Sequence, residues 1–135
     1  MRVFVDTSVW SLAFRRDRPP STPEVDLLGD ALAGRSDVFT TGLVLQELLQ
    51  GFRGARARDR ILDAFAAVPM LTPDRRDHVE AADLRTHCRR RGIQIETIDA
   101  LLAQLCLRHD LSMLTTDGDF RRIAKVRPLR VWKPA

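Results

Sequence analysis

Apolar residues along this chain fall into short runs that are separated by longer segments with helical spacing. The short runs are rich in β-branched and aromatic residues and predict four strands, at residues 3–5, 38–41, 111–115 and 129–132. The segments between them predict helices at residues 10–14, 22–34, 43–52, 54–67 and 73–91, one from residue 97, and a short one after the turn at 117–120. Because strands alternate with helices, we expect an α/β fold with a mostly parallel sheet covered on both faces.

Two of these helices carry strong local signals. Thr22 has the position of an N-cap with Pro23 as the first helical residue, and Gly34 is expected to end that helix. The helix from Thr97 has a single apolar stripe, with residues at i, i+3, i+4, i+7 and i+8: Ile98, Leu101, Leu102, Leu105 and Cys106. Such a stripe is typical of a helix that packs on a core.

The length and composition are those of one ordinary globular domain. The chain has 135 residues, of which 44% are hydrophobic and 30% charged, so we expect a single domain over residues 1–135. No run approaches the roughly 18 to 20 apolar residues of a membrane span, and Asp6 would interrupt a signal-peptide core. We therefore expect a cytoplasmic protein that does not contact a membrane.

The cysteines and histidines do not form a known catalytic or zinc-binding pattern. Cys88 and Cys106 lack the close spacing of a zinc site and are too few for a disulfide framework, so we expect both to stay reduced. The three histidines show no HExxH spacing and no nearby serine or cysteine elbow. Catalysis by a histidine-based triad is therefore not expected.

Acidic residues stand where apolar segments meet a turn or a helix start. Asp6 follows the first predicted strand, Asp117 follows the third, and Asp99 lies in the first turn of the striped helix. A fourth acid, Glu47, lies inside the apolar segment GLVLQELLQGF. Open parallel sheets gather ligand chemistry at the carboxyl ends of their strands, so we expect these carboxylates to converge there.

Clustered carboxylates repel one another unless cations neutralise them. A site built from carboxylates without histidine or cysteine favours Mg²⁺ or Mn²⁺ over zinc, and such ions support the attack of an activated water on a phosphodiester. Without the four acids, 14 acidic residues remain against 22 basic ones, a formal charge of +8 that favours a polyanionic substrate. Taken singly, the acids also fit an N-cap, a first-turn acid, an Asx turn and an exposed helix residue.

Three segments, in this order along the chain, resemble the PIN-domain ribonucleases and in particular the VapC-type toxins of bacterial toxin–antitoxin pairs. They are VFVDTSVW, TTGLVLQELLQG and IQIETIDALLAQLCLRHDLSMLTTDGDF. The resemblance covers nearly the whole chain and implies an α/β/α sandwich with a parallel sheet of four to five strands. It also implies metal-dependent endoribonuclease activity on RNA, a cognate antitoxin that blocks the site, and a homodimer.

The resemblance also implies roles for individual residues. The family's acidic positions fall on Asp6, Glu47, Asp99 and Asp117. We expect Asp6, Asp99 and Asp117 to hold Mg²⁺ or Mn²⁺, with Asp6 as the central ligand and Glu47 either binding the ion or orienting its water. The expected supporting residues are Thr7 or Ser8 after the first acid, Thr115 before the last one, and Asp119, which either touches the metal directly or acts through water or caps a turn.

Arginine makes up 20 of the 22 basic residues, which is compatible with either a GC-rich genome or an anionic partner. Clusters lie in the first loop, beyond Glu47, and at residues 89–91 near a helix end. A charge run is usually a solvated face, but two clusters are best placed to approach single-stranded or looped RNA. Their proposed RNA-binding residues are Arg15, Arg16, Arg53 and Arg56.

Two other function classes compete with a nuclease. A phosphatase with an aspartyl nucleophile needs a second Asp two positions after the first, and Ser8 occupies that position. A non-catalytic RNA- or partner-binding module would use the acids as caps and the arginines as contacts. Dependence of RNA binding or cleavage on a divalent metal separates that module from a nuclease.

Overall fold

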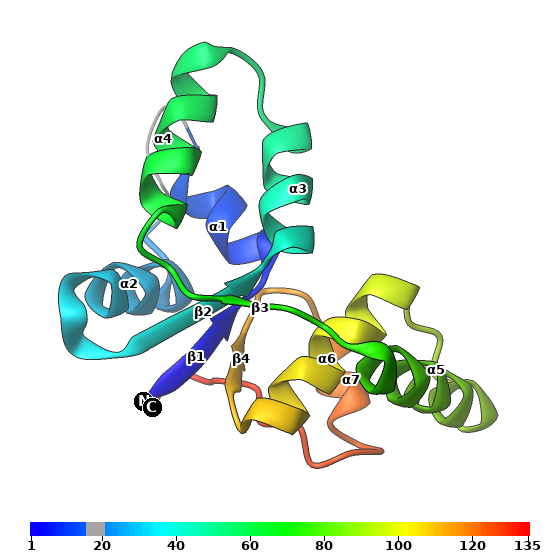
Figure 1. Cartoon of the computed structure of the whole chain (residues 1–135). Helices are drawn as coiled ribbons and strands as arrows, with labels where there is room; N and C mark the ends of the chain where they lie inside the picture. Colours follow the sequence, from blue (N-terminus) through cyan, green and yellow to red (C-terminus); the bar gives the residue numbers. More distant parts are fainter. Residues whose placement is uncertain (16–20) are drawn as a thin grey trace.

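A four-stranded, all-parallel sheet forms the centre of the computed structural model, which describes residues 1–15 and 21–135 (Figure 1). The strand order is β3-β2-β1-β4. The strands are Arg2–Val5 (β1), Asp37–Thr41 (β2), Met70–Leu71 (β3) and Ser112–Leu114 (β4). Val3 of β1 pairs with Val38 on one side and with Ser112 on the other, which puts the carboxyl ends of these strands at one edge.

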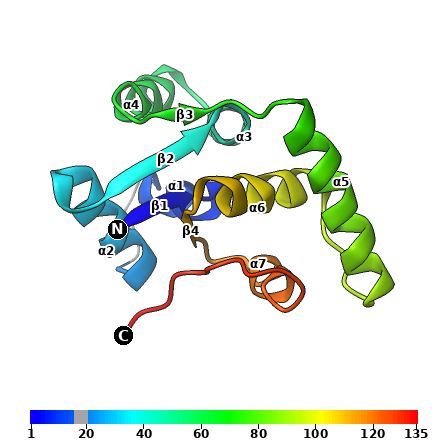
Figure 2. The same cartoon turned by 60° about the horizontal axis from the view of Figure 1, so that its bottom comes forward.

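Helices lie on both sides of this sheet within the described part of the chain. Figures 1 and 2 show α5, α6 and α7 grouped together, apart from α1 to α4. The helices are α1 (Thr7–Ala13), α2 (Pro23–Asp30), α3 (Gly42–Gly51), α4 (Ala55–Phe65), α5 (Arg75–Arg90), α6 (Thr97–His109) and α7 (Asp119–Ile123), with a π-helical turn at Ala31–Arg35 after α2. The predicted α/β fold with a parallel sheet is confirmed.

The core is built on the central strand β1. Its residues Val3, Phe4 and Val5 are fully buried, as expected for a strand that is covered on both faces. The striped helix α6 is more deeply buried than its periodicity suggests, because every residue from Leu101 to Cys106 lies inside. Cys88 and Cys106 are both buried and free.

The structure confirms the predicted N-cap at Thr22 and the predicted role of Gly34, and it shifts the start of the first helix. The Thr22 side chain accepts a hydrogen bond from Val25 N at 3.2 Å and caps α2. Gly34 has a φ of 98°, a conformation that glycine adopts without strain, and ends the following turn. Helix α1 begins at Thr7, earlier than predicted, because the Asp6 backbone oxygen accepts from Val9 N at 3.1 Å.

A partly buried ionic contact fixes α5 against α6. Asp77 is fully buried and its carboxylate accepts from Arg108 Nη1 at 2.5 Å. Gln104 donates to Glu80 at 2.5 Å, so more than one polar contact ties α6 to α5. Asp77 also closes a capping box with Asp74 at the start of α5. These contacts position α6, whose first turn carries Asp99.

Two strand predictions differ from the structure. The predicted strand at residues 129–132 is wrong, since only Val131 forms a bridge, to Met113. Pro128 and Pro134 flank this segment and cannot donate backbone hydrogen bonds, which limits ladder formation. The edge strand β3 was not predicted, because its two residues are too short for an alternating pattern. No described helix has the length and apolar character needed to span a membrane.

Candidate functional site

The candidate site lies at the carboxyl ends of the two neighbouring strands β1 and β4. Asp6 follows β1 directly, and Thr115 and Asp117 follow β4. Asp6 N donates to Leu114 O at 3.0 Å, so the two chain segments remain paired at the point where they leave the sheet. Polar side chains from distant parts of the sequence are thereby brought to the same sheet edge.

Asp6 is held by two hydroxyl groups. It is only 7% exposed, and its Oδ2 atom accepts hydrogen bonds from Ser8 Oγ and Thr115 Oγ1, each at 2.9 Å. Burial raises the pKa of Asp6, and the hydrogen bonds from Thr115 and Ser8 oppose that rise. Both hydroxyls use Oδ2, which leaves Oδ1 without a side-chain donor among the described residues.

The two hydroxyl residues after Asp6 have different partners. Ser8 contacts Asp6, whereas Thr7 Oγ1 donates to Glu47 Oε1 at 3.0 Å. Glu47 is half-buried on α3 rather than exposed to solvent. The hydrogen bond from Thr7 therefore links Glu47 to the strand end that carries Asp6.

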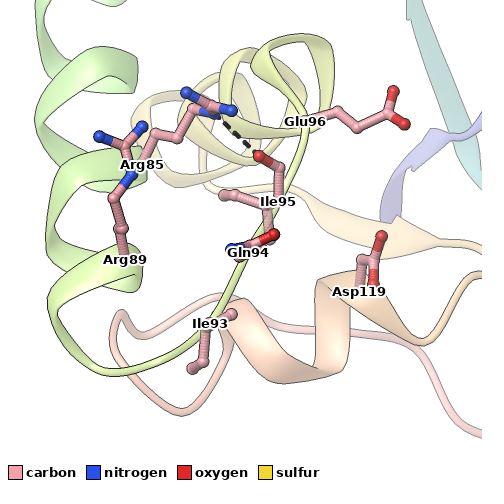
Figure 3. Close-up of a pocket in the computed structure, with 7 residues that line it drawn as sticks. All are labelled: Arg85, Arg89, Ile93, Gln94, Ile95, Glu96 and Asp119. Carbon is pink, nitrogen blue, oxygen red and sulfur yellow. Dashed lines mark hydrogen bonds between the residues drawn. The ribbon is translucent and has the colours of Figure 1, made fainter.

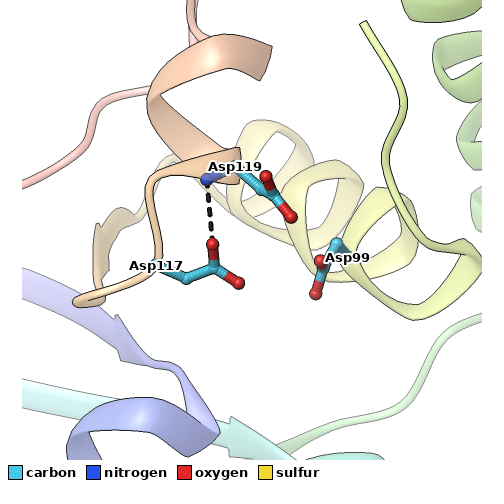
Figure 4. A group of neighbouring side chains, drawn as sticks. All are labelled: Asp99, Asp117 and Asp119. Atoms are coloured by element: carbon cyan, nitrogen blue, oxygen red, sulfur yellow. Dashed lines mark hydrogen bonds between the residues drawn. The ribbon is translucent and has the colours of Figure 1, made fainter.

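Three carboxylates meet beside this pair of strand ends. Asp99 comes from the first turn of α6, Asp117 from the loop after β4, and Asp119 from the start of α7. Each offers an oxygen within 4.8 Å of the other two, and Figure 4 shows the three side chains directed toward one another. We refer to Asp99, Asp117 and Asp119 as the carboxylate group.

Backbone hydrogen bonds order the loop that contributes two of these acids. Thr115 Oγ1 accepts from Asp117 N at 2.9 Å, and Asp117 Oδ1 accepts from Asp119 N at 2.9 Å. Asp117 therefore forms an Asx turn, the alternative role that the sequence allowed for it, and also belongs to the carboxylate group. Arg122, one turn along α7, pairs with Asp119.

Burial, together with the crowding of negative charge, raises the pKa of Asp99. Burial raises the pKa of Asp99 to about 7, and the charges of Asp6, Asp117, Glu96 and Asp119 add to the rise. At neutral pH the site therefore holds a proton in part of the population. A divalent cation bound there would displace that proton and relieve the repulsion.

The structure brings together most of the residues that the sequence singled out. Asp99 and Asp117 share the carboxylate group with Asp119. From the sequence, Asp119 could be either a metal contact or a turn cap. Asp6 lies outside the three-residue group but close enough for its charge to raise the pKa of Asp99. Glu47 joins the same edge through Thr7.

The basic residues include arginines that the sequence indicated as RNA-binding and one that it did not single out. Arg15, Arg53 and Arg56 are exposed, and Arg16 lies outside the described residues. Arg122 was missed, although its position three residues after Asp119 on a predicted helix is a usual spacing for an ion pair.

The donors suit a hard divalent cation. All three side chains of the carboxylate group offer oxygen, and the group contains no histidine or cysteine. Mg²⁺ and Mn²⁺ prefer such ligands, whereas zinc sites favour nitrogen and sulfur. Burial and the neighbouring negative charges raise the pKa of Asp99, which is a second sign that positive charge close to this carboxylate is insufficient.

Replacing Asp99 with Asn should stabilise the metal-free protein at neutral pH. The pKa of Asp99 is about 7 in the folded protein against an ordinary value of 3.8, so wild-type stability should fall as pH rises from about 4 to about 7. D99N removes this loss. As pH rises to about 7, the free energy of unfolding of D99N should exceed that of the wild type by up to about 2 kcal/mol, which is less than the pKa difference alone would give because solvent screens the charges. Urea unfolding in EDTA at several pH values measures this advantage.

Asp83→Asn is the matched control for this experiment, because Asp83 is an exposed acid on α5 outside the carboxylate group. D83N should unfold like the wild type at every pH. A D99N advantage that is as large at pH 4 as at pH 8 would contradict the electrostatic explanation.

Comparisons with known proteins agree with the fold. Residues 3–126 match the family described as PIN domain. VapBC2 from Rickettsia felis, bound to a DNA fragment from its promoter, superposes with a TM-score of 0.76 at 20% identity over 98% of both chains. VapBC-5 from Mycobacterium tuberculosis, of the VapBC family of toxin–antitoxin systems, gives 0.67 at 22% identity, again over 98% of both chains.

A third solved structure is that of a toxin with a stated RNA target. VapC20 from Mycobacterium tuberculosis, a toxin that cleaves the sarcin-ricin loop, superposes with a TM-score of 0.65 at 19% identity, over 88% of this chain and 92% of that chain. A comparison with curated protein sequences finds no significant match. Because the family match spans almost the whole chain, the protein belongs to the PIN domain family.

Proposed function

We propose that this protein is a metal-dependent endoribonuclease and the toxin of a toxin–antitoxin pair. The observation that carries the proposal is the carboxylate group at the sheet edge of a PIN domain, with the pKa of Asp99 raised to about 7. The likeness to VapC20, a sarcin-ricin loop cleaving toxin, supports RNA as the substrate class. The excess of basic over acidic residues supports a polyanionic partner.

Asp99, Asp117 and Asp119 would hold Mg²⁺ or Mn²⁺ together with Asp6, whose Oδ1 atom is not used by Ser8 or Thr115. A cation bound there supplies a Lewis acid that polarises the phosphodiester and lowers the pKa of a water molecule. Ser8 and Thr115 fix the orientation of the Asp6 carboxylate. Asp6 keeps its proposed central role because Thr115 Oγ1 hydrogen-bonds both its carboxylate and the backbone N of Asp117, a member of the carboxylate group.

Glu47 is proposed either to bind the ion or to orient its water. Its Oε1 atom takes the hydrogen bond from Thr7, which leaves Oε2 free of side-chain donors among the described residues. Thr7 acts as a positioning residue in this scheme. The exposed Arg15, Arg53 and Arg56 are proposed to hold the phosphates of single-stranded or looped RNA beyond the site.

Replacing Asp6 with Asn should abolish RNA cleavage without unfolding the protein. The Asn side-chain oxygen can still accept from Ser8 and Thr115, but it carries no charge for a cation. Total bacterial RNA is incubated with each protein in Mg²⁺, Mn²⁺ or EDTA, and the new ends are mapped by sequencing. We expect specific cuts by the wild type in either metal and none in EDTA.

D83N again serves as the control, since it removes an exposed acid elsewhere, and it should cleave like the wild type. Circular dichroism checks that D6N remains folded. Full activity of D6N, or wild-type cutting that persists in EDTA, would contradict the proposal. RNA binding without any cleavage, equal in EDTA and Mg²⁺, would instead favour a non-catalytic RNA-binding module.

We also propose that the protein has a cognate antitoxin, forms a homodimer and is located in the cytoplasm. The antitoxin is supported by the likeness to VapBC-5, a member of a toxin–antitoxin family, and to VapBC2 bound to promoter DNA. A small neighbouring reading frame that encodes a DNA-binding protein would be the candidate antitoxin.

Induced expression of the wild-type protein should stop the growth of a bacterial host, because unopposed RNA cleavage blocks protein synthesis. D99N should not stop growth, and co-expression of the neighbouring protein should restore growth to cells that express the wild type. Colony counts after induction measure both effects, with immunoblots to confirm equal expression. Equal growth arrest by wild type and D99N would show that toxicity does not come from the carboxylate group.

A further inference from the structure

A pocket of about 520 Å³ lies directly beside the carboxylate group, between α5 and the segment that leads into α6 (Figure 3). It shares Asp119 with the carboxylate group. Its volume lies in the range of pockets that hold a small-molecule-sized ligand. Neither the predicted metal ligands nor the predicted RNA-binding arginines account for it.

The charges of this pocket are separated into two walls. Arg85 and Arg89 of α5 lie on one side, and Glu96 and Asp119 lie on the other (Figure 3). The guanidinium of Arg89 has no hydrogen-bond or ion-pair partner among residues 1–15 and 21–135, whereas the carboxylate of Asp119 is paired with Arg122. The cationic wall therefore offers an exposed guanidinium to an anion, while the acidic wall is contiguous with the proposed metal site.

The backbone of residues 94 and 95, which forms the floor of the pocket, accepts hydrogen bonds from arginines of two helices. Arg85 Nε donates to Ile95 O at 2.8 Å, and Arg122 Nη2 donates to Gln94 O at 3.2 Å. These bonds fix the backbone of residues 94 and 95 between α5 and α7. A pocket fixed in this way binds its ligand with little ordering cost.

We infer that this pocket binds the nucleotide next to the scissile phosphodiester of a single-stranded RNA, with Arg89 on the phosphate of that nucleotide. The inference rests on the proposed function. Two neighbouring phosphates of one strand need separate positive partners, and the site provides them at opposite ends: a cation at the carboxylate group and a guanidinium on α5. Glu96 and Asp119 disfavour a phosphate on the acidic wall, so the second phosphate is directed to Arg89.

Two other residues complete a nucleotide site. Gln94 is exposed and lines the pocket with a side-chain amide that can both donate to and accept from a base edge. Ile93 is half-buried and offers an apolar surface for a base face. Single-stranded RNA is recognised by such contacts to unstacked bases, which a regular duplex does not expose.

The test compares Arg89→Gln with Arg90→Gln. Both residues are exposed in the last turn of α5 and both variants remove one positive charge, but Arg90 does not line the pocket. The probe is a short fluorescein-labelled random-sequence RNA, titrated in EDTA at several salt concentrations so that it is not cleaved. R89Q should bind about tenfold more weakly and lower the slope of log Kobs against log salt by about 0.7, whereas R90Q should change affinity less than twofold.

Cleavage and metal binding separate this inference from the proposed function. In Mg²⁺, R89Q should raise KM with kcat nearly unchanged, and its Mn²⁺ affinity should equal that of the wild type. Equal weakening by R89Q and R90Q, an unchanged affinity of R89Q, or failure of the wild type to bind the probe would overturn the pocket assignment. A wild type that binds the probe through Arg89 but never cleaves RNA would overturn the proposed function and leave the pocket as an RNA-binding site without a scissile phosphodiester.

Discussion

Mutual repulsion among carboxylates at one edge of the sheet is the constraint on which the site depends. Asp99 lies partly buried beside the charges of Asp6, Asp117 and Asp119, and its pKa is raised to about 7 as a result. A fold gains no stability from such crowding in the absence of a cation, because each added negative charge makes the others harder to ionise. The crowding is explained if the site is shaped for a bound divalent ion, whose charge turns repulsion into attraction.

Uncharged hydrogen-bond donors hold these carboxylates in place without neutralising their charge. Ser8 and Thr115 orient Asp6, Thr7 orients Glu47, and Thr115 also accepts from the backbone of Asp117. Hydroxyl groups satisfy carboxylate oxygens while leaving their negative charge available for a metal. Arg122 is the exception, since it pairs with Asp119 and ties α7 to the floor of the neighbouring pocket.

The sequence predicted the parts of the fold and site that depend on local pattern. The apolar runs of β1 and β4 and the stripe of α6 were sufficient for an α/β fold, and the acids that interrupt them identified the sheet edge. The sequence did not reveal contacts that depend on tertiary packing: the two-residue strand β3, the reduction of residues 129–132 to one bridge, and the pocket between α5 and residues 93–96. Whether Thr7 or Ser8 supports Asp6 also required coordinates, because both hydroxyls lie within two residues of Asp6 in the sequence.

The central claim is that the carboxylate group binds a divalent cation. Crystals soaked in Mn²⁺ and measured near the manganese absorption edge would locate the ion from its anomalous signal. The account predicts a peak among the oxygens of Asp99, Asp117 and Asp119, adjacent to Asp6, and no such peak in crystals of D99N. A peak elsewhere on the protein with none at this group, or an equal peak in D99N, would contradict it.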